Sequence, residues 1–231
     1  TTLFRSMKRS EINEIIRQGC EFLSECRFNL PPFAFWTPAE WEQKGHEADE
    51  IRRNRLGWDV TDLGKGDFEN TGLLLFTVRN GNPGNPDDPK SYCEKIMISR
   101  PGQHCSMHFH WDKVEDIINR AGGDLMIRLY GSDEAEEMDT ENPVQVSMDG
   151  VVYTVDAGQT VRLQPGESIT LTPGLYHNFW AEGGPVLAGE VSTVNDDESD
   201  NRFAEPLGRF PAIEEDEPPL YYLCTEYPPA E

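Results

Sequence analysis

Apolar residues in the first quarter of the chain recur every three or four positions, which is the period of one helical face. These positions are Ile12, Ile15, Ile16, Cys20 and Leu23. Ser10 precedes them as a candidate N-cap. Thr37-Pro38 predicts a second helix start, continued through residues 39–54. We therefore expect residues 1–56 to form a helical segment.

After Gly57 the period changes, and roughly ten short apolar or alternating runs follow, separated by turn residues. Examples are LLLFTV, EKIMIS, DLMIRLY, HNFWA and VLAGEVSTV. Asp149-Gly150 between two runs predicts a two-residue hairpin. This pattern predicts a mainly β fold of the sandwich or barrel type over residues 57–194 rather than a parallel α/β sheet.

The last part, residues 195–231, is irregular and acidic but carries several large apolar residues. They can anchor a tail, so we expect an ordered segment that wraps the β core. With the helices packed on the barrel, the three parts would form one structural domain.

Composition narrows the functional classes. Acidic residues outnumber Lys and Arg by 42 to 20, a net charge of −22. Such a surface repels phosphate backbones and anionic lipids, so no nucleic-acid or membrane partner is expected. Five scattered cysteines indicate reduced thiols, and no apolar run nears the ~20 residues that span a bilayer. With no apolar leader in the first residues, the sequence predicts a soluble, cytoplasmic protein.

The densest chemistry lies in residues 102–123, which hold three of the five histidines. If the stretch is a strand, His104, Ser106, His108 and His110 share one face, and Cys105, Met107, Phe109 and Trp111 the other. The spacing His-x-His suits one divalent ion, and Glu115 after a turn could add an oxygen ligand. His104 precedes His108 by four residues, about 13 Å along a strand, too far for a ligand.

His177 follows the turn Pro173-Gly174 and enters another short run. Taken alone, it could be a hydrogen-bonded core histidine. Together with the first cluster, it is a natural fourth ligand from a neighbouring strand.

Two segments carry a family resemblance. Gly102, His108-Phe109-His110, Glu115 and Gly122, separated by five, four and six residues, resemble the first cupin motif. The segment from Gly166 to His177-Asn178 is similar to the second, although its Pro-Gly turn departs from the usual spacing. Residues 101–123, 189–201 and 208–217 together resemble the D-lyxose isomerase family.

The resemblance implies a cupin-type jelly-roll β-barrel whose ion, Mn²⁺ or another divalent metal such as Co²⁺ or Fe²⁺, is held by His108, His110, Glu115 and His177. It further implies an intramolecular oxidoreductase, a D-lyxose ketol-isomerase. Such an enzyme would interconvert D-lyxose and D-xylulose, with D-mannose and D-fructose as a second pair. An enediol and a hydride-shift route both remain open.

An isomerase also needs groups that move protons. Lys113, two residues before Glu115, is the first catalytic candidate, and burial near a divalent cation would lower its pKa. Glu190 and Glu215 are equal candidates for a carboxylate base. Lys95 could bind a sugar hydroxyl, and Arg209 could close the pocket over the substrate.

Two alternatives remain at this level. An Fe(II) cupin dioxygenase would accept similar ligands, but it would favour an apolar pocket. A non-catalytic sugar-binding cupin would not need the metal ligands. We also expect a homodimer, because the apolar face with Met107, Phe109 and Trp111 could pack against a second copy, although the N-terminal helices could cover it instead.

Overall fold

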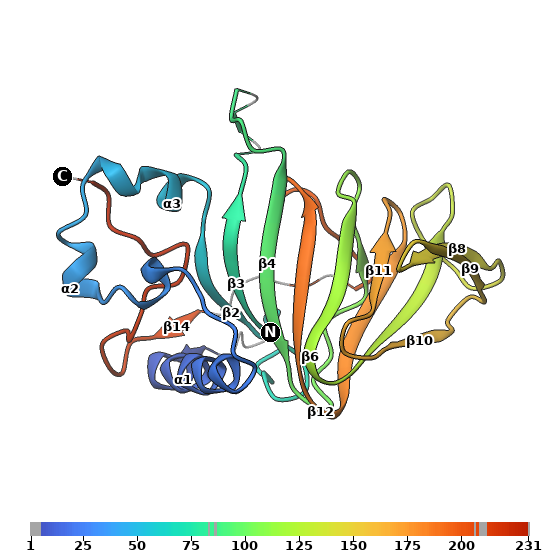
Figure 1. Cartoon of the computed structure of the whole chain (residues 1–231), viewed down its shortest axis with the longest axis horizontal. Helices are drawn as coiled ribbons and strands as arrows, with labels where there is room; N and C mark the ends of the chain where they lie inside the picture. Colours follow the sequence, from blue (N-terminus) through green and yellow to red (C-terminus); the bar gives the residue numbers. More distant parts are fainter. Residues whose placement is uncertain (1–5, 83, 86, 206, 208–211, 231) are drawn as a thin grey trace.

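A computed structural model describes residues 6–82, 84–85, 87–205, 207 and 212–230. Within these residues one antiparallel sheet dominates (Figure 1). Its main order is β2 (Gly57–Thr61), β3 (Leu73–Asn80), β4 (Tyr92–Ser99), β12 (Tyr176–Thr193), β6 (Glu115–Ser132), β11 (Ser168–Leu171), β8 (Val144–Met148) and β9 (Val151–Val155). The short strands β10 (Thr160–Leu163) and β7 (Met138–Asp139) also pair with β6.

Two long strands, β6 and β12, run through the middle of the molecule and pair with each other along most of their length. The sequence predicted separate runs here, because glycines and polar residues interrupt the apolar pattern. The structure joins them through a β-bulge, where a Cβ atom at Gly123 would lie only 2.4 Å from the carbonyl oxygen of Glu182. Glycine therefore lets one strand cross a point where the backbones approach closely.

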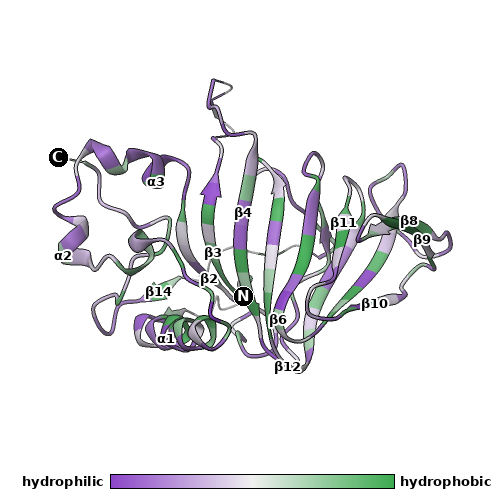
Figure 2. Cartoon of the chain, in the orientation of Figure 1, coloured by the Kyte–Doolittle hydropathy of each residue, from purple (hydrophilic) through white to green (hydrophobic). Residues whose placement is uncertain are grey.

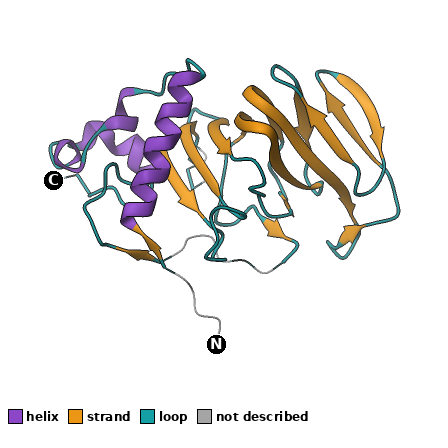
Figure 3. Ribbon diagram, turned by 90° about the horizontal axis from the view of Figure 1, so that it is seen from below, coloured by secondary structure: helices purple, strands orange, loops and turns teal. Residues whose placement is uncertain are grey.

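The sheet is buried on both faces at the helical end of the molecule. Leu73 and Leu75 of β3 point into the barrel core, whereas Leu74 and Phe76 point into a second core. This double burial explains the uninterrupted run LLLF. Figure 2 shows the apolar and polar residues along the strands, and Figure 3 shows the helices gathered at one end of the sheet.

Helix α1 (Arg9–Glu25) covers that outer face with Ile12, Ile15, Ile16 and Leu23, as its period predicts. It begins two residues earlier than predicted, because the N-cap is Lys8 and not Ser10. The Ser10 hydroxyl donates instead to Asp216 of the tail.

The second predicted helix is shorter than its pattern suggests. Thr37 is confirmed as N-cap, and its hydroxyl and Glu40 form a reciprocal capping box. The helix α2 (Pro38–Trp41) then stops, and the chain continues through a 3₁₀ turn, His46–Ala48, into α3 (Asp49–Arg53). Another 3₁₀ turn, Pro32–Phe35, precedes α2.

The tail returns to the N-terminal segment. Strand β14 (Ile213–Glu214) pairs with β1 (Met7–Lys8), and the side chain of Asn13 bonds the backbone of Pro218 and Leu220. Cys224 donates its backbone N–H to Trp58 of β2. The predicted fold class is therefore confirmed: a mainly β cupin-type barrel with N-terminal helices and an irregular tail, whose described residues are ordered against the N-terminal segment and β2.

The predicted hairpin is also present, since Asp149 and Gly150 both have positive φ, 50° and 81°, between β8 and β9. None of the helices in the described part of the chain is long and apolar enough to cross a membrane.

Candidate metal and catalytic site

Three buried histidines meet inside the barrel. His108 lies in the two-residue strand β5 (His108–Phe109), directly opposite His177 of β12. His110 follows β5 and turns back toward them, with its ring centre 5.7 Å from that of His177. One ring nitrogen of each histidine lies within 4.8 Å of the other two. The three predicted imidazole ligands therefore come together.

A backbone carbonyl orients each ring. The Nδ1 atoms of His108, His110 and His177 lie 2.8, 2.6 and 3.0 Å from the carbonyl oxygens of Ser106, Asp200 and Leu175. A carbonyl only accepts, so each Nδ1 carries the hydrogen and each Nε2 keeps its lone pair. Burial, together with the other two histidines, holds the pKa of His108 well below its ordinary value. Neutral imidazoles with free Nε2 atoms are what metal binding requires.

Glu115, the first residue of β6, lies beside two of the rings. Its Oε1 is 3.2 Å from Nε2 of His177 and 3.5 Å from Nε2 of His110. Burial alone would raise the pKa of Glu115, but the positive charge of Lys113, the largest opposing cause, helps to hold it well below the ordinary value. Three imidazole nitrogens and one carboxylate oxygen fit a first-row divalent ion such as Mn²⁺.

A second group of charges adjoins the histidines. The ammonium of Lys113 lies 2.8 Å from Oε2 of Glu115 and 2.9 Å from Oε1 of Glu190, a β12 residue. Lys95 of β4 lies 3.6 Å from the same Glu190 oxygen. All four side chains are buried. Lys113, Glu190 and Lys95 thus share one pocket with the histidines.

The charges in this group set the pKa of Lys113 in the opposite direction to that expected from the sequence. Burial would lower its pKa, but Glu115 and Glu190 outweigh burial and raise it above the ordinary value. Burial would likewise raise the pKa of Glu190, whereas Lys113 and Lys95 lower it. The sequence expectation concerned a lysine beside a divalent cation. It showed the lysine but not the second carboxylate, Glu190, whose charge acts in the opposite direction.

The segment after β12 covers the site. We call residues 195–203 the strap. Its short strand β13 (Arg202–Phe203) pairs with β5, and the ring of Phe203 lies 5.5 Å from that of His108. The Asp200 carboxylate accepts the backbone N–H groups of Asp112 and Lys113. The sequence predicted an ordered tail over residues 195–231 but named no residue of the strap as part of the site, because an acidic run usually forms a solvated surface. Its position directly after a core strand was the available signal.

The site opens into a cavity of about 90 Å³. Polar residues line it together with Leu73, Leu75, Met97, Ile117 and Phe179 of the barrel. Cys105 also lines it, contrary to the predicted alternation, because the strand begins only at His108 and residues 105–107 are irregular. The predicted back face is therefore only partly correct: Phe109 is buried against Tyr176, and Trp111 is exposed.

One predicted catalytic residue does not meet this group. Glu215 is largely exposed and pairs with Arg9 of α1, and it does not line the cavity. Arg209 lies outside the described residues. His104 packs on Trp180 and is not part of the histidine group, in agreement with the distance argument.

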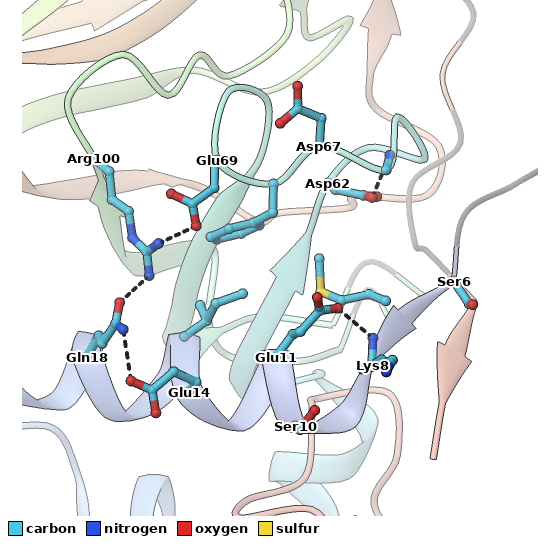
Figure 4. A pocket seen from close by; sticks show the side chains of 14 residues that line it. Ser6, Lys8, Ser10, Glu11, Glu14, Gln18, Asp62, Asp67, Glu69 and Arg100 are labelled. Atoms are coloured by element: carbon cyan, nitrogen blue, oxygen red, sulfur yellow. Dashed lines mark hydrogen bonds and ion pairs between the residues drawn. The ribbon is translucent and has the colours of Figure 1, made fainter. Parts of the chain in front are cut away.

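A larger cavity of about 680 Å³ lies elsewhere, between α1 and the β2–β3 connection (Figure 4). Its walls carry Glu11, Glu14, Asp67 and Glu69. Arg100 already pairs with Glu69 and donates to Gln18. The cavity holds no converging histidines, so the described residues place the metal-binding chemistry in the barrel.

Comparison with known proteins agrees with this geometry. A protein from Serratia proteamaculans named D-lyxose/D-mannose isomerase is 51% identical, covering 96% of this chain and 98% of its own. A protein of the same name from Escherichia coli O157:H7 is 49% identical with the same coverage. The L-ribose isomerase of Acinetobacter sp. DL28, solved with L-ribose, shares the fold at 17% identity. Its TM-score is 0.59, over 90% of this chain and 98% of that one.

The family model for D-lyxose isomerase matches residues 7–227. That range includes the histidine group, the lysine–carboxylate group and the strap. With this match and the full-length relatives, the chain belongs to the D-lyxose isomerase family, a family of sugar isomerases.

Proposed function

We propose that the protein interconverts D-lyxose and D-xylulose, with D-mannose and D-fructose as a second pair. One observation carries the proposal. The same buried pocket holds three converging imidazoles and a lysine joined to two carboxylates, within 2.9 Å on each side. The names of the full-length relatives support these substrates. An aldose–ketose isomerase needs both parts, one to polarise a carbonyl and one to move protons.

The proposed ligands are His108, His110, His177 and Glu115, and the proposed ion is Mn²⁺, with Co²⁺ or Fe²⁺ as substitutes. When bound, it would polarise the sugar carbonyl and acidify the hydrogen on C2. Phe203 and the apolar barrel wall would exclude water from the reacting carbons.

Two side chains would carry the protons. Glu190 begins ionised, takes the proton from C2 and returns one to C1. Lys113 begins protonated, donates to the carbonyl oxygen on C1 and takes the proton of the C2 hydroxyl. The aldose then becomes the ketose, and both side chains regain their starting states. Lys95, which also lines the cavity, would bind a sugar hydroxyl.

Assays of the purified protein on D-lyxose and D-mannose test the proposal. We expect conversion that EDTA abolishes and added Mn²⁺ restores, with L-ribose as the comparison sugar. If the manganese-loaded protein converts neither D-lyxose nor D-mannose, the proposal fails. Tightly bound iron with oxygen consumption would favour the dioxygenase, and sugar binding without turnover or metal would favour the binding module.

We further propose that the protein acts as a cytoplasmic homodimer. All five cysteines are free thiols, which suits a reducing compartment. Trp111 and Val114, both exposed beside β5, could contribute to a contact between copies. Light scattering on the purified protein would measure the mass, and a value near 26.2 kDa would rule out the dimer.

A further inference from the structure

A side-chain amide, that of Asn195, contacts both lysines of the lysine–carboxylate group, which consists of Lys95, Lys113, Glu115 and Glu190. Asn195, the first residue of the strap, is buried at 7% exposure. Its Oδ1 accepts from Lys95 at 2.6 Å and from Lys113 at 3.3 Å. Both ammonium groups also face Oε1 of Glu190. The two ammonium donors, Lys95 and Lys113, therefore alternate with two oxygen acceptors, Oδ1 of Asn195 and Oε1 of Glu190, in a closed cycle of contacts.

Asn195 supplies an acceptor that Lys113 needs. An ammonium group has three N–H donors, and Lys113 has three acceptors within reach: Glu115, Glu190 and Asn195. A carboxylate in place of the amide would add another charge beside Glu115, Glu190 and Asp197. A neutral oxygen acceptor joins the lysines without adding that charge.

Asn195 does not line the cavity in which the sugar would bind, although both lysines and Glu190 do. It lines a neighbouring cavity, to which neither lysine contributes. A sugar in the site would therefore not touch Asn195. Any effect of Asn195 on the reaction must pass through the lysines.

Another asparagine holds the backbone of Asn195. Asn80, the last residue of β3, accepts the backbone N–H of Asn195 at 2.9 Å and donates to its carbonyl at 2.9 Å. The carbonyl of Asn80 in turn accepts from the side chain of Asn54. The two bonds between Asn80 and Asn195 join the end of β3 to the residue that follows β12, so they set the position of the strap's first residue.

We propose that Asn195 is a positioning residue of the active site, whose side-chain oxygen holds Lys95 and Lys113 against Glu190, and that Asn80 fixes Asn195 for this task. The inference rests on the proposed function for its kinetic consequence. Its structural consequence, the placement of the two ammonium groups, stands independently of any substrate.

The first test removes the acceptor but keeps the volume. In the metal-loaded Asn195→Leu variant we expect kcat to fall about 10- to 100-fold, and to change more than KM, because misplacement of about 1 Å costs on that order. Asn195→Gln keeps a neutral amide oxygen as acceptor and should recover part of the loss. Equal loss in both variants would overturn the proposal.

A matched control separates positioning from general destabilisation. Asn119 is fully buried, and its amide donates to the carbonyls of Gly123 and Leu163, away from the lysines. Asn119→Ala should lower the unfolding free energy but leave kcat near the wild-type value. If Asn119→Ala loses as much turnover as Asn195→Leu, the effect of Asn195 is not positional.

The link to Asn80 is tested by a double-mutant cycle. Asn80→Ala alone should lower kcat, but it should add little in the Asn195→Leu background, because both act through the same contact. Fully additive losses would contradict the link.

Crystal structures of Asn195→Leu and the wild type provide a readout without substrate. We expect at least one ammonium group to leave Glu190 in the variant, and unmoved lysines would sink the inference. If the wild type isomerises no sugar, the proposed function fails, while the lysine positions still decide the role of Asn195.

Discussion

At the scale of single residues, the orientation of each histidine ring in the site depends on a backbone carbonyl oxygen. A motif of side-chain types does not include such an atom. Three carbonyls, from Ser106, Leu175 and Asp200, hold the Nδ1 hydrogens and so direct the Nε2 lone pairs together. Two of them lie two residues before the histidine they orient, but the carbonyl of Asp200 comes from the strap. His110 therefore depends on a segment ninety residues away.

His177→Ala should abolish tight binding of a divalent metal, because it removes one of three converging nitrogens and leaves the Glu115 oxygen without its nearest ring. Metal content after dialysis measures this directly. His104→Ala is the matched control, because that ring packs on Trp180 outside the group. A His177→Ala protein that still retains one metal per chain would contradict the assigned ligand set.

Glu190→Gln should keep the metal but lower kcat by about 10²- to 10⁴-fold, the usual contribution of a general base. Glu215→Gln serves as its control. That carboxylate is 56% exposed, pairs with Arg9 and lies away from the cavity, so turnover should stay near the wild-type value. Steady-state kinetics on D-lyxose would compare the two, and the opposite order of effects would reassign the base to the tail.

At the scale of elements, the tail and α1 depend on each other. Arg9 in the first turn of the helix is only 2% exposed, and its guanidinium reaches Glu215 and Glu226 of the tail. These carboxylates raise the pKa of Arg9 despite its burial. The buried guanidinium needs both partners to offset its lost hydration. The pair therefore ties the two ends of the described chain together.

Arg9→Met should lower the unfolding free energy by about 2–4 kcal/mol, because it breaks the bonds of a buried cation to two partly exposed carboxylates. Urea unfolding at pH 7 measures the loss. Arg17→Met, which removes an exposed pair with Glu14, should cost less than about 1 kcal/mol. Equal losses of unfolding free energy in the two variants would mean that the burial of Arg9 adds nothing to stability.

The contact between Arg9 and Glu215 makes the free energy of unfolding depend on pH. A side-chain hydrogen bond from Arg9 lowers the pKa of Glu215 below its ordinary value of 4.5. A carboxylate with a depressed folded-state pKa stabilises the fold above its unfolded pKa, and this stability is lost as pH falls through the folded pKa. The difference between wild type and Arg9→Met should therefore be full near neutrality and shrink below pH 4.5. A difference that is constant down to pH 3 would exclude this origin.

At the scale of the whole molecule, metal binding and folding should be linked. The proposed ligands come from β5, the residue after it, β6 and β12, and they meet only in the fold. Free metal at 100 times its Kd would add about 2.7 kcal/mol of stability. For a chain of this size, that raises Tm by roughly 5–10 °C.

Thermal unfolding with Mn²⁺ and with EDTA measures this shift, and His177→Ala should lose it. A wild-type Tm that is insensitive to both treatments would contradict a metal held by these residues.

The sequence by itself determined the β class, the period of α1, the hairpin at Asp149-Gly150 and the candidate ligands, because each depends on local spacing or local backbone preference. The length of β6 and β12 did not follow, since their bulge depends on close approach of two strands at Gly123. The predicted alternation of side chains through Cys105 was also wrong, because the long-range pairing of His108 with His177 of β12 decides where β5 begins.

The positions of Glu190 and Glu215 were likewise left to the tertiary structure. Both were carboxylates of unknown position until the fold placed one against Lys113 and the other against Arg9. Sequence spacing shows which chemical groups are present. Only packing decides which charges share a low-dielectric pocket, and that sharing sets their pKa values and their partners.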